Sequence, residues 1–323
     1  LAWMFFLHNC FASLQDVSTD ALAVDILHPD ERGQINGYMW GSKIVGVGIG
    51  SSIMGTILVN TSLNTTVLFQ AGLVLAVMIF PLIFRERKGE KLLPWTKGKS
   101  MLASDIAAVR NPLSVLKNLL QGFSLKATFM GAIFLLSASV GDGINGAILP
   151  VLFMQNLEWE PDIYSQVVGG FGTILEVCGA LLGGFLADRV GRRKIITAGY
   201  GGFAIVAILF GVFSIHWGNN AFASAYLVTY PFFRALGAVA IFSLFMHISW
   251  TKSAATMFTS YMAFSNMSST MGSKIAGYIK DWIPFDMTFI LLGVLAFIPL
   301  IFLIWINPDS IAKIKRSDSS IET

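Results

Sequence analysis

Two aspartates lie four residues apart in an apolar part of the chain, within the segment QDVSTD. Residues four apart are neighbours on one face of a helix, so Asp16 and Asp20 are expected to lie close together. Two close carboxylates in a low dielectric cannot both ionise at low cost, and one of them is expected to titrate near physiological pH. The pair is therefore a candidate for reversible proton binding. The alternative is a pair hydrogen-bonded to small neighbours or neutralised by a base on helices expected to precede this sequence.

Ionisable and polar side chains also interrupt the other apolar stretches. An Asp, Lys or Arg at the centre of a membrane costs roughly 2.5–3.5 kcal/mol, so such residues are functional candidates. Asp142 lies in GDGINGAILP, whose glycines allow a bent helix, and Asn145 follows it by one turn. Glu176 and Arg234 either pair with each other or contact a substrate, and Lys43 either lines a cavity or reaches the interface. The predicted substrate-cavity residues are Gln15, Lys43, Asp142, Asn145, Glu176 and Arg234.

The sequence contains none of the motifs that indicate catalysis. It has no nucleophile elbow, phosphate-binding loop or Cys/His metal pattern, and His216 and His247 have no partner at metal-ligand spacing. We therefore expect no catalytic residue, no bound metal, no cofactor and no nucleic-acid partner. The chain is not expected to be an enzyme.

The elements that must position these residues are long apolar helices. Of 323 residues, 54% are hydrophobic and 13% are charged, whereas a soluble domain has roughly 25% charged residues. The apolar blocks are about 20 residues long, which is enough for a helix to cross a membrane. The predicted spans lie near residues 1–27, 36–59, 65–84, 128–153, 164–187, 193–214, 222–247, 254–278 and 284–306. Because the alternation typical of β-barrels is absent, the sequence predicts an all-α integral membrane protein.

Lysine and arginine are concentrated in alternate connections between these spans. The connections near 60–64, 155–163 and 216–221 contain neither, whereas residues 85–127 contain nine. Positive residues stay on the cytosolic side. We therefore expect a multi-pass protein of the cytoplasmic (inner) membrane with a cytosolic C-terminus. In this topology Asp20 lies nearer than Asp16 to the cytosolic mouth, which favours Asp20 as the titrating member of the pair.

The basic segment 85–127 divides the spans into two sets. Its second part, DIAAVRNPLSVLKNLL, has apolar residues at helical intervals, which predicts an amphipathic helix at the membrane surface. The predicted organisation is the remainder of an N-terminal half with three helices (1–84), a cytoplasmic central loop (85–127), a six-helix C-terminal half (128–306) and a cytoplasmic tail (307–323). Six spans follow the loop and three precede it, so about three helices are expected to be missing from the start.

A cluster of charged residues in the segment LADRVGRRK separates two apolar stretches. The pattern Gly184-x-x-x-Asp188-Arg189-x-Gly191-Arg192-Arg193-Lys194 resembles the loop signature of the major facilitator superfamily, in its second-half copy. Gly184 permits close helix approach, and the arginines can pair with Asp188 or with the carbonyl ends of neighbouring helices. Such pairs could hold the cytosolic side in one conformation.

The alternative for this segment is a basic loop that only sets the topology. Three charged residues near the cytosolic end of the first spans are expected to form the matching network of the other half. The predicted gating residues are Asp25, Glu31, Arg32, Gly184, Asp188, Arg189, Gly191, Arg192, Arg193 and Lys194.

A second stretch resembles one group within that superfamily. Residues 12–55 are similar to the fourth and fifth helices of the AmpG-type muropeptide permeases and acetyl-coenzyme A transporters. Residues 116–126 also resemble that group. The matching residues are Gln15, Asp16, Asp20, Asp25, Pro29, Glu31, Arg32 and Gly33, followed by a glycine-rich helix.

These resemblances imply a helical bundle of two six-helix halves, of which about nine of twelve helices are present. The expected function is a secondary transporter that works by alternating access and takes up a polar solute, such as an anhydro-muropeptide, with protons. The alternatives are a permease of the same fold for a sugar, a drug or an acyl-coenzyme A, and a non-transporting membrane receptor or assembly protein. The expected partners are the small-molecule solute, protons and the lipid bilayer, and the full-length protein is expected to be a monomer.

Overall fold

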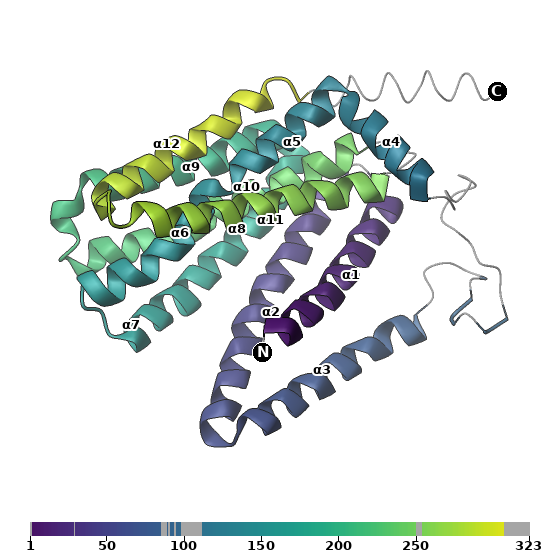
Figure 1. Cartoon of the computed structure of the whole chain (residues 1–323), viewed down its shortest axis with the longest axis horizontal. Coiled ribbons are helices and arrows are strands. Elements are labelled where there is room, and N and C mark those ends of the chain that lie inside the picture. The colour runs from purple at the N-terminus through teal and green to yellow at the C-terminus, as the bar shows by residue number, and fades with distance from the viewer. Residues whose placement is uncertain are drawn as a thin grey trace. The chain divides into compact units, whose positions relative to one another are not determined.

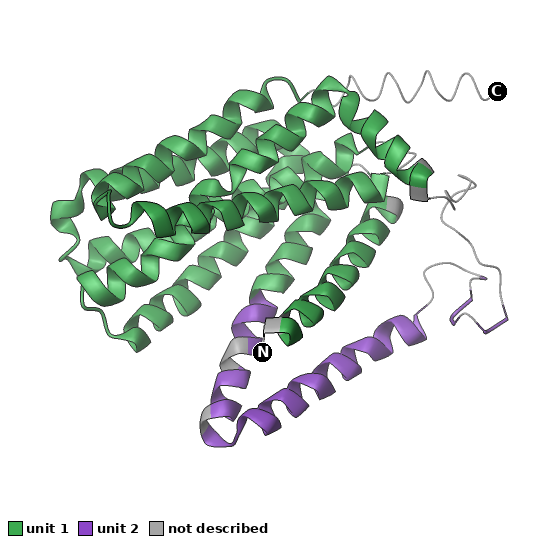
Figure 2. Cartoon of the chain, viewed as in Figure 1, with its two compact units in different colours: residues 1–44, 113–323 green, residues 45–112 purple. Residues whose placement is uncertain are grey.

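The chain folds into helices throughout the residues that the structure describes. The computed structural model describes residues 2–28, 30–84, 112–249 and 254–306, with a few positions between 89 and 97. No strand occurs among them, and each predicted span coincides with one helical stretch. The chain divides into two units, one of residues 1–44 and 113–323 and one of residues 45–112 (Figure 2). The fold is thus the all-α membrane bundle that the composition predicts.

The smaller unit contains the end of α2 (Arg32–Asn60) and all of α3 (Leu63–Ile83). The Ser62 hydroxyl begins α3 by accepting a hydrogen bond from the Thr65 amide at 3.2 Å, a common N-terminal cap. Thr66 is the one buried residue of this apolar helix. A helix that is apolar on all sides and exposed within the chain is suited to contact with lipid or with another helix.

The larger unit begins with α1 (Ala2–Ile26) and the first part of α2. Ala23 and Val24, near the end of α1, are buried in the hydrophobic core, whereas Trp3, Phe11 and Leu14 are more than half exposed. Helix α1 packs against α11. The N-terminal helix therefore joins the rest of the unit mainly through its C-terminal end.

Six long helical stretches make up the rest of the larger unit (Figure 1). They pack in pairs: α9 contacts α10 and α12, α10 contacts α8, and α6 contacts α11. Large side chains such as Phe134, Phe210 and Phe289 are fully buried between them. The stretches are α5 (Lys126–Ala138) with α6 (Val140–Val151) and a π-helical turn (Leu152–Asn156); α7 (Pro161–Gln166) with a π-helical turn (Val167–Gly172), α8 (Thr173–Leu186) and another such turn (Ala187–Gly191); α9 (Arg192–Val212); α10 (Asn220–Ile248); α11 (Ala254–Ile279); and α12 (Phe285–Leu303).

Six helices of the described chain are long and apolar enough to cross a membrane. One of them, Pro161–Val212, has 52 residues and would be roughly 78 Å long if straight, more than twice a membrane core of about 30 Å. Gly191, with φ 110°, interrupts it and so divides it into two crossings. Helices α1 and α11 are not among these six. Helix α1 carries three aspartates, and α11 is rich in serine and threonine, and these residues lower the mean hydropathy of each helix.

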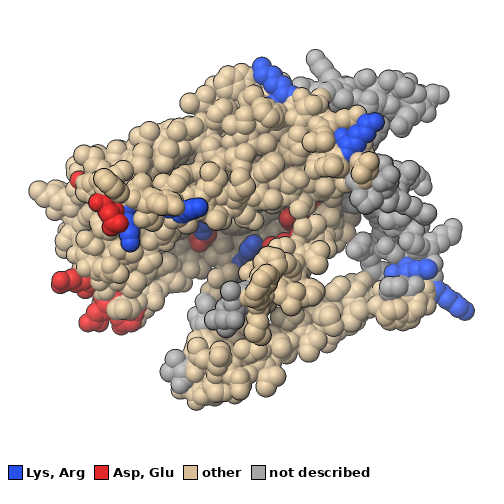
Figure 3. All heavy atoms as spheres, in the orientation of Figure 1, with Lys and Arg blue, Asp and Glu red and all other residues tan. Residues whose placement is uncertain are grey.

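The molecular surface has the character expected of a chain in lipid. Most of the face in view carries neither basic nor acidic side chains, and one group of acidic side chains lies near α7 (Figure 3). Large apolar residues such as Phe171, Ile174 and Ile205 are more than half exposed. An exposed apolar surface on this scale is stable only when lipid or another protein segment covers it.

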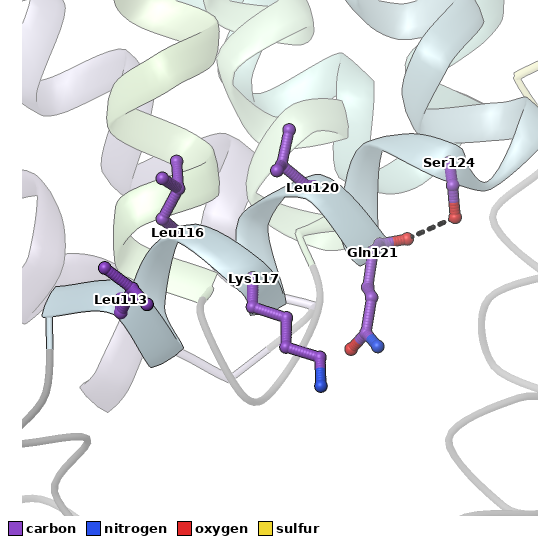
Figure 4. A pocket seen from close by; sticks show the side chains of 6 residues that line it. All are labelled: Leu113, Leu116, Lys117, Leu120, Gln121 and Ser124. Carbon is purple, nitrogen blue, oxygen red and sulfur yellow. Dashed lines mark hydrogen bonds between the residues drawn. The ribbon is translucent and has the colours of Figure 1, made fainter.

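A short amphipathic helix, α4 (Pro112–Ser124), precedes the six long stretches. Leu116 and Leu120 point to one side of it and Lys117 and Gln121 to the other (Figure 4). These residues line a shallow surface groove, and the three leucines at positions 113, 116 and 120 are more than half exposed. Residues 112–120 of the predicted amphipathic helix are thus helical, while its first part, 105–111, lies outside the described residues.

Candidate functional site

A guanidinium lies between two carboxylates inside the six-stretch bundle. Arg234 of α10 donates a hydrogen bond to Oε1 of Glu176 on α8, and its Nη1 atom lies 3.6 Å from Oδ2 of Asp142 on α6. The Arg234, Glu176 and Asp142 side chains are 31%, 15% and 32% exposed, so water can reach the group. We call these three residues the central charge cluster. They are distant in the sequence, and the fold brings them together.

A break in one long helical stretch sets the position of Asp142. Ser139 separates α5 from α6 and has φ −100° and ψ 6°, outside the helical range. The hydroxyl of Ser268, on α11, accepts a hydrogen bond from the Ser139 amide at 3.0 Å. Asp142 consequently lies in the first turn of α6, where the helix dipole favours a negative charge. The expected bend of this helix is present, two residues before Gly141.

Close backbone packing brings Glu176 to Arg234. A Cβ atom on Gly183 would lie 2.7 Å from the carbonyl oxygen of Leu236, so α8 and α10 approach each other more closely than larger residues would permit. Gly179, one turn nearer to Glu176, faces the Phe232 carbonyl in the same way. The two glycines therefore determine the separation at which the acid and the base can bond.

Asn145 lies one turn beyond Asp142 on α6 and is 1% exposed. Its Oδ1 atom accepts a hydrogen bond from the Tyr226 hydroxyl at 2.7 Å, whereas its Nδ2 atom is buried without a hydrogen-bond partner. The Tyr226 ring stacks on Phe210 and on Tyr230. An unsatisfied buried donor costs about 1–3 kcal/mol, so this amide is available to a polar ligand that reaches it.

The acids of α1 form a second charged group with Lys43 of α2. The Nζ atom of Lys43 lies 4.0 Å from Oδ2 of Asp16 and 5.7 Å from the centre of the Trp40 ring. Asp16 and Lys43 are exposed, with 71% and 61% of their side chains accessible, and Asp20 is half-buried. Gln15 is exposed on the same helix. Lys43 of α2 is therefore the base that can neutralise Asp16.

A carboxylate of α8's C-terminal π-helical turn, Asp188, binds backbone amides at the start of α2. Oδ1 of Asp188 accepts a hydrogen bond from the Gly33 amide at 3.0 Å, and Oδ2 accepts one from the Gln34 amide at 2.8 Å. These amides belong to the first turn of α2, where N–H groups have no partner inside the helix. A Cβ on Gly33 would lie 2.6 Å from the Gly184 carbonyl oxygen, so the two helices touch at their backbones. We call this contact the gate end.

Arginines reinforce the gate end by binding helix carbonyls. Arg192 pairs with Asp188 at 3.3 Å and donates to the Ser243 hydroxyl at 2.7 Å. Arg32 donates to the Met246 carbonyl, in the last turn of α10, at 2.8 Å, and Arg193 donates to the Ile306 carbonyl just after α12. Both kinds of contact considered from the sequence, with Asp188 and with helix carbonyls, therefore occur.

The remaining predicted gating residues lie around this contact. Arg189 stacks on the Phe185 ring at 4.0 Å, and Gly191 supplies the positive φ that ends one helix before α9. Glu31 and Lys194 are exposed. The side chain of Asp25 lies outside the described residues.

Several contacts of these sites involve residues that sequence reasoning did not select. Ser243 binds Arg192, Ser268 stabilises the helix break, and the amides of Gly33 and Gln34 bind Asp188. Serines in helices and backbone amides are too common to be singled out by type. The sequence did identify the acid Asp188. It could not specify which groups donate hydrogen bonds to that acid.

Two family profiles match the chain. One, described as Major Facilitator Superfamily, matches residues 131–322, and the other, described as BT1 family, matches residues 1–215. Each covers more than half of the chain, and together they extend over nearly all of it. The chain belongs to the major facilitator superfamily.

Membership of this superfamily indicates in what kind of protein the charged groups lie. The protein is a multi-pass membrane transporter, and proteins of this superfamily move small-molecule solutes. The superfamily match includes the central charge cluster and Asp188, and the BT1 match includes α1 and α2. Both predicted halves of the gate end are thus inside matched sequence.

Proposed function

We propose that this protein takes up a polar solute together with protons across the cytoplasmic membrane, by alternating access between two six-helix halves. The observation that carries the proposal is the central charge cluster: an acid–base–acid group, partly open to water, inside a membrane bundle. Charged side chains in such a place are costly and usually serve a solute or ion pathway. A purely structural ion pair would not need a second acid on the same arginine.

The proposed solute is an anhydro-muropeptide, as in the AmpG-type permeases that residues 12–55 resemble. Such a molecule carries carboxylates, amides and sugar hydroxyls. Arg234 could bind a carboxylate, while Asp142 and the free Nδ2 atom of Asn145 could bind hydroxyl or amide groups. Gln15 and Lys43 are proposed to contact the same solute from the N-terminal helices.

Asp16 and Asp20 are proposed to exchange protons with the solution, with Asp20 as the titrating member. Lys43 lies near Asp16, so it compensates one of the two negative charges. The negative charge of the other acid is then uncompensated, so a less polar environment favours binding of a proton by that acid.

The gate end is proposed to lie at the cytosolic surface and to be sealed in the conformation described here. The Asp188 contacts with α2 would break when the cytosolic side opens. The exposed leucines of α4 are proposed to lie in the membrane interface on that side, with Lys117 directed toward lipid headgroups.

Uptake of labelled anhydro-muropeptide into membrane vesicles under an imposed proton gradient tests this function. We expect gradient-driven uptake with the unmodified protein and its loss in Asp20→Asn at equal membrane abundance. Asp281→Asn is the matched control, because Asp281 is an exposed aspartate in the turn between α11 and α12, outside these sites. It should transport normally.

Two other results would contradict parts of the proposal. Full gradient-driven uptake in both Asp16→Asn and Asp20→Asn would remove the proton role of the pair. Uptake of a sugar, drug or acyl-coenzyme A in place of the muropeptide would replace the solute, and failure to transport any of them would favour a receptor or assembly role.

A further inference from the structure

The central charge cluster does not balance its charges. With all three groups ionised, the carboxylates of Asp142 and Glu176 face a single guanidinium, so one negative charge remains. An uncompensated charge in the interior of a membrane bundle is strongly unfavourable. The group therefore needs one more positive charge whenever solvent access is reduced.

We propose that the central charge cluster binds one proton, shared between Asp142 and Glu176, at a site separate from Asp16 and Asp20. This inference deepens the proposed proton-coupled function and rests on it. The proton comes from the aqueous phase and enters through Asp142, which is twice as exposed as Glu176. Its binding converts one carboxylate into a carboxylic acid and leaves the cluster neutral.

Competition for Arg234 explains why the proton is shared. The guanidinium bonds directly to Glu176 and lies 3.6 Å from Asp142, so a small rotation exchanges its partner. Whichever acid Arg234 releases loses its counter-charge and takes the proton, and the pair titrates as a unit. Asp142 lies in the first turn of α6, and Glu176 is the more buried of the two acids.

No other acid or base of the described chain is paired with the cluster. Hydroxyls of three tyrosines lie within electrostatic range of it: Tyr200, Tyr226 and Tyr230. Charged or titratable side chains of the elements packed on α6, α8 and α10 are Arg32, Lys43, Lys126, Asp162, Asp188, Arg189, Arg192, Arg193, Lys194, His247, Lys274 and Asp286.

Infrared spectroscopy of the purified full chain in lipid nanodiscs tests the proposal, with the proton itself as the probe. The carboxylic acid C=O band should appear as pH is lowered, and part of it should belong to the cluster. Glu176→Gln and Asp142→Asn each leave Arg234 with one acid, so each should remove that part. Asp20→Asn should retain it, and Asp281→Asn, in an exposed turn, should remove only the contribution of a carboxyl group in water.

Each alternative outcome overturns the inference. If both Glu176→Gln and Asp142→Asn keep the full band, the cluster stays ionised and the proton site is confined to α1. If sodium ions at constant pH and ionic strength abolish the cluster's part, a metal cation supplies the missing charge. The two variants are independent, so misfolding of one leaves the other decisive. The measurement needs no transport, and a failure to carry muropeptide would therefore not affect it.

Discussion

At the scale of single residues, the two charged groups differ in how strongly they depend on their base. Arg234 is held between two half-buried carboxylates, whereas Lys43 stands 4.0 Å from an exposed Asp16. Removing one partner from a buried ion pair leaves an uncompensated charge, while an exposed pair contributes little because water screens it. The two bases should thus have very different effects on stability.

We expect Arg234→Gln to destabilise the protein by about 3 kcal/mol, because Asp142 and Glu176 then repel each other without a counter-charge. Lys43→Gln, the matched change in the exposed group, should cost about 0–1 kcal/mol. Thermal unfolding of the two variants at neutral pH compares them. Equal shifts would mean that Arg234 is as well solvated as Lys43.

The sequence identifies these residues by their positions inside apolar blocks and not by their contacts. A charge inside an apolar block is visible in the sequence, so Asp142, Glu176 and Arg234 could be selected one by one. The sequence left pairing of Glu176 with Arg234 open as one of two alternatives, and the structure shows that pair. The position of Asp142 beside the same arginine was not visible, because a single sequence carries no distances between its helices. The same is true of Asp188 and Gly33, which are 155 residues apart.

At the scale of helices, small residues determine which pairs can come together. Gly184 of α8 meets Gly33 of α2 backbone to backbone, and Gly183 meets Leu236 of α10. Gly184 was readable from the sequence as a site of close approach. The neighbouring helix at each glycine was not readable, since any helix can offer a backbone.

We expect Gly184→Ala to weaken the α8–α2 contact, because its Cβ would overlap the carbonyl of Gly33. Overpacking of this kind costs roughly 1–3 kcal/mol. Gly201→Ala on α9 is the matched control, since a Cβ there meets nothing within 4 Å. Thermal unfolding and solvent labelling at the gate end should distinguish the variants, and similar behaviour of both would argue against close packing at position 184.

At the scale of the whole molecule, the gate end joins α2 to the end of α8 within the larger unit. Trp40 and Ile44 of α2 pack against Ala180, Ala235 and Val239, beyond the Asp188 contacts. In the proposed alternating-access cycle this contact opens each time the cytosolic side opens. A covalent bond across it should therefore stop transport.

We expect a disulfide between Gly41→Cys and Val177→Cys, after Cys10 and Cys178 are replaced by serine, to block solute uptake reversibly. A Cβ on Gly41 would lie 3.9 Å from Cγ1 of Val177, within the reach of a disulfide. Oxidation should abolish uptake, reduction should restore it, and neither single cysteine should respond. Undiminished uptake by the oxidised pair would show that α2 and α8 need not separate.

The way Asp188 holds α2 also bears on how this contact can change in evolution. Its two partners are peptide N–H groups, which every amino acid except proline provides. Drift at position 34 can therefore alter the side chain freely without touching the bond, and position 33 is restricted by size alone. In these two hydrogen bonds, the carboxylate of Asp188 is therefore the one side chain that must be kept.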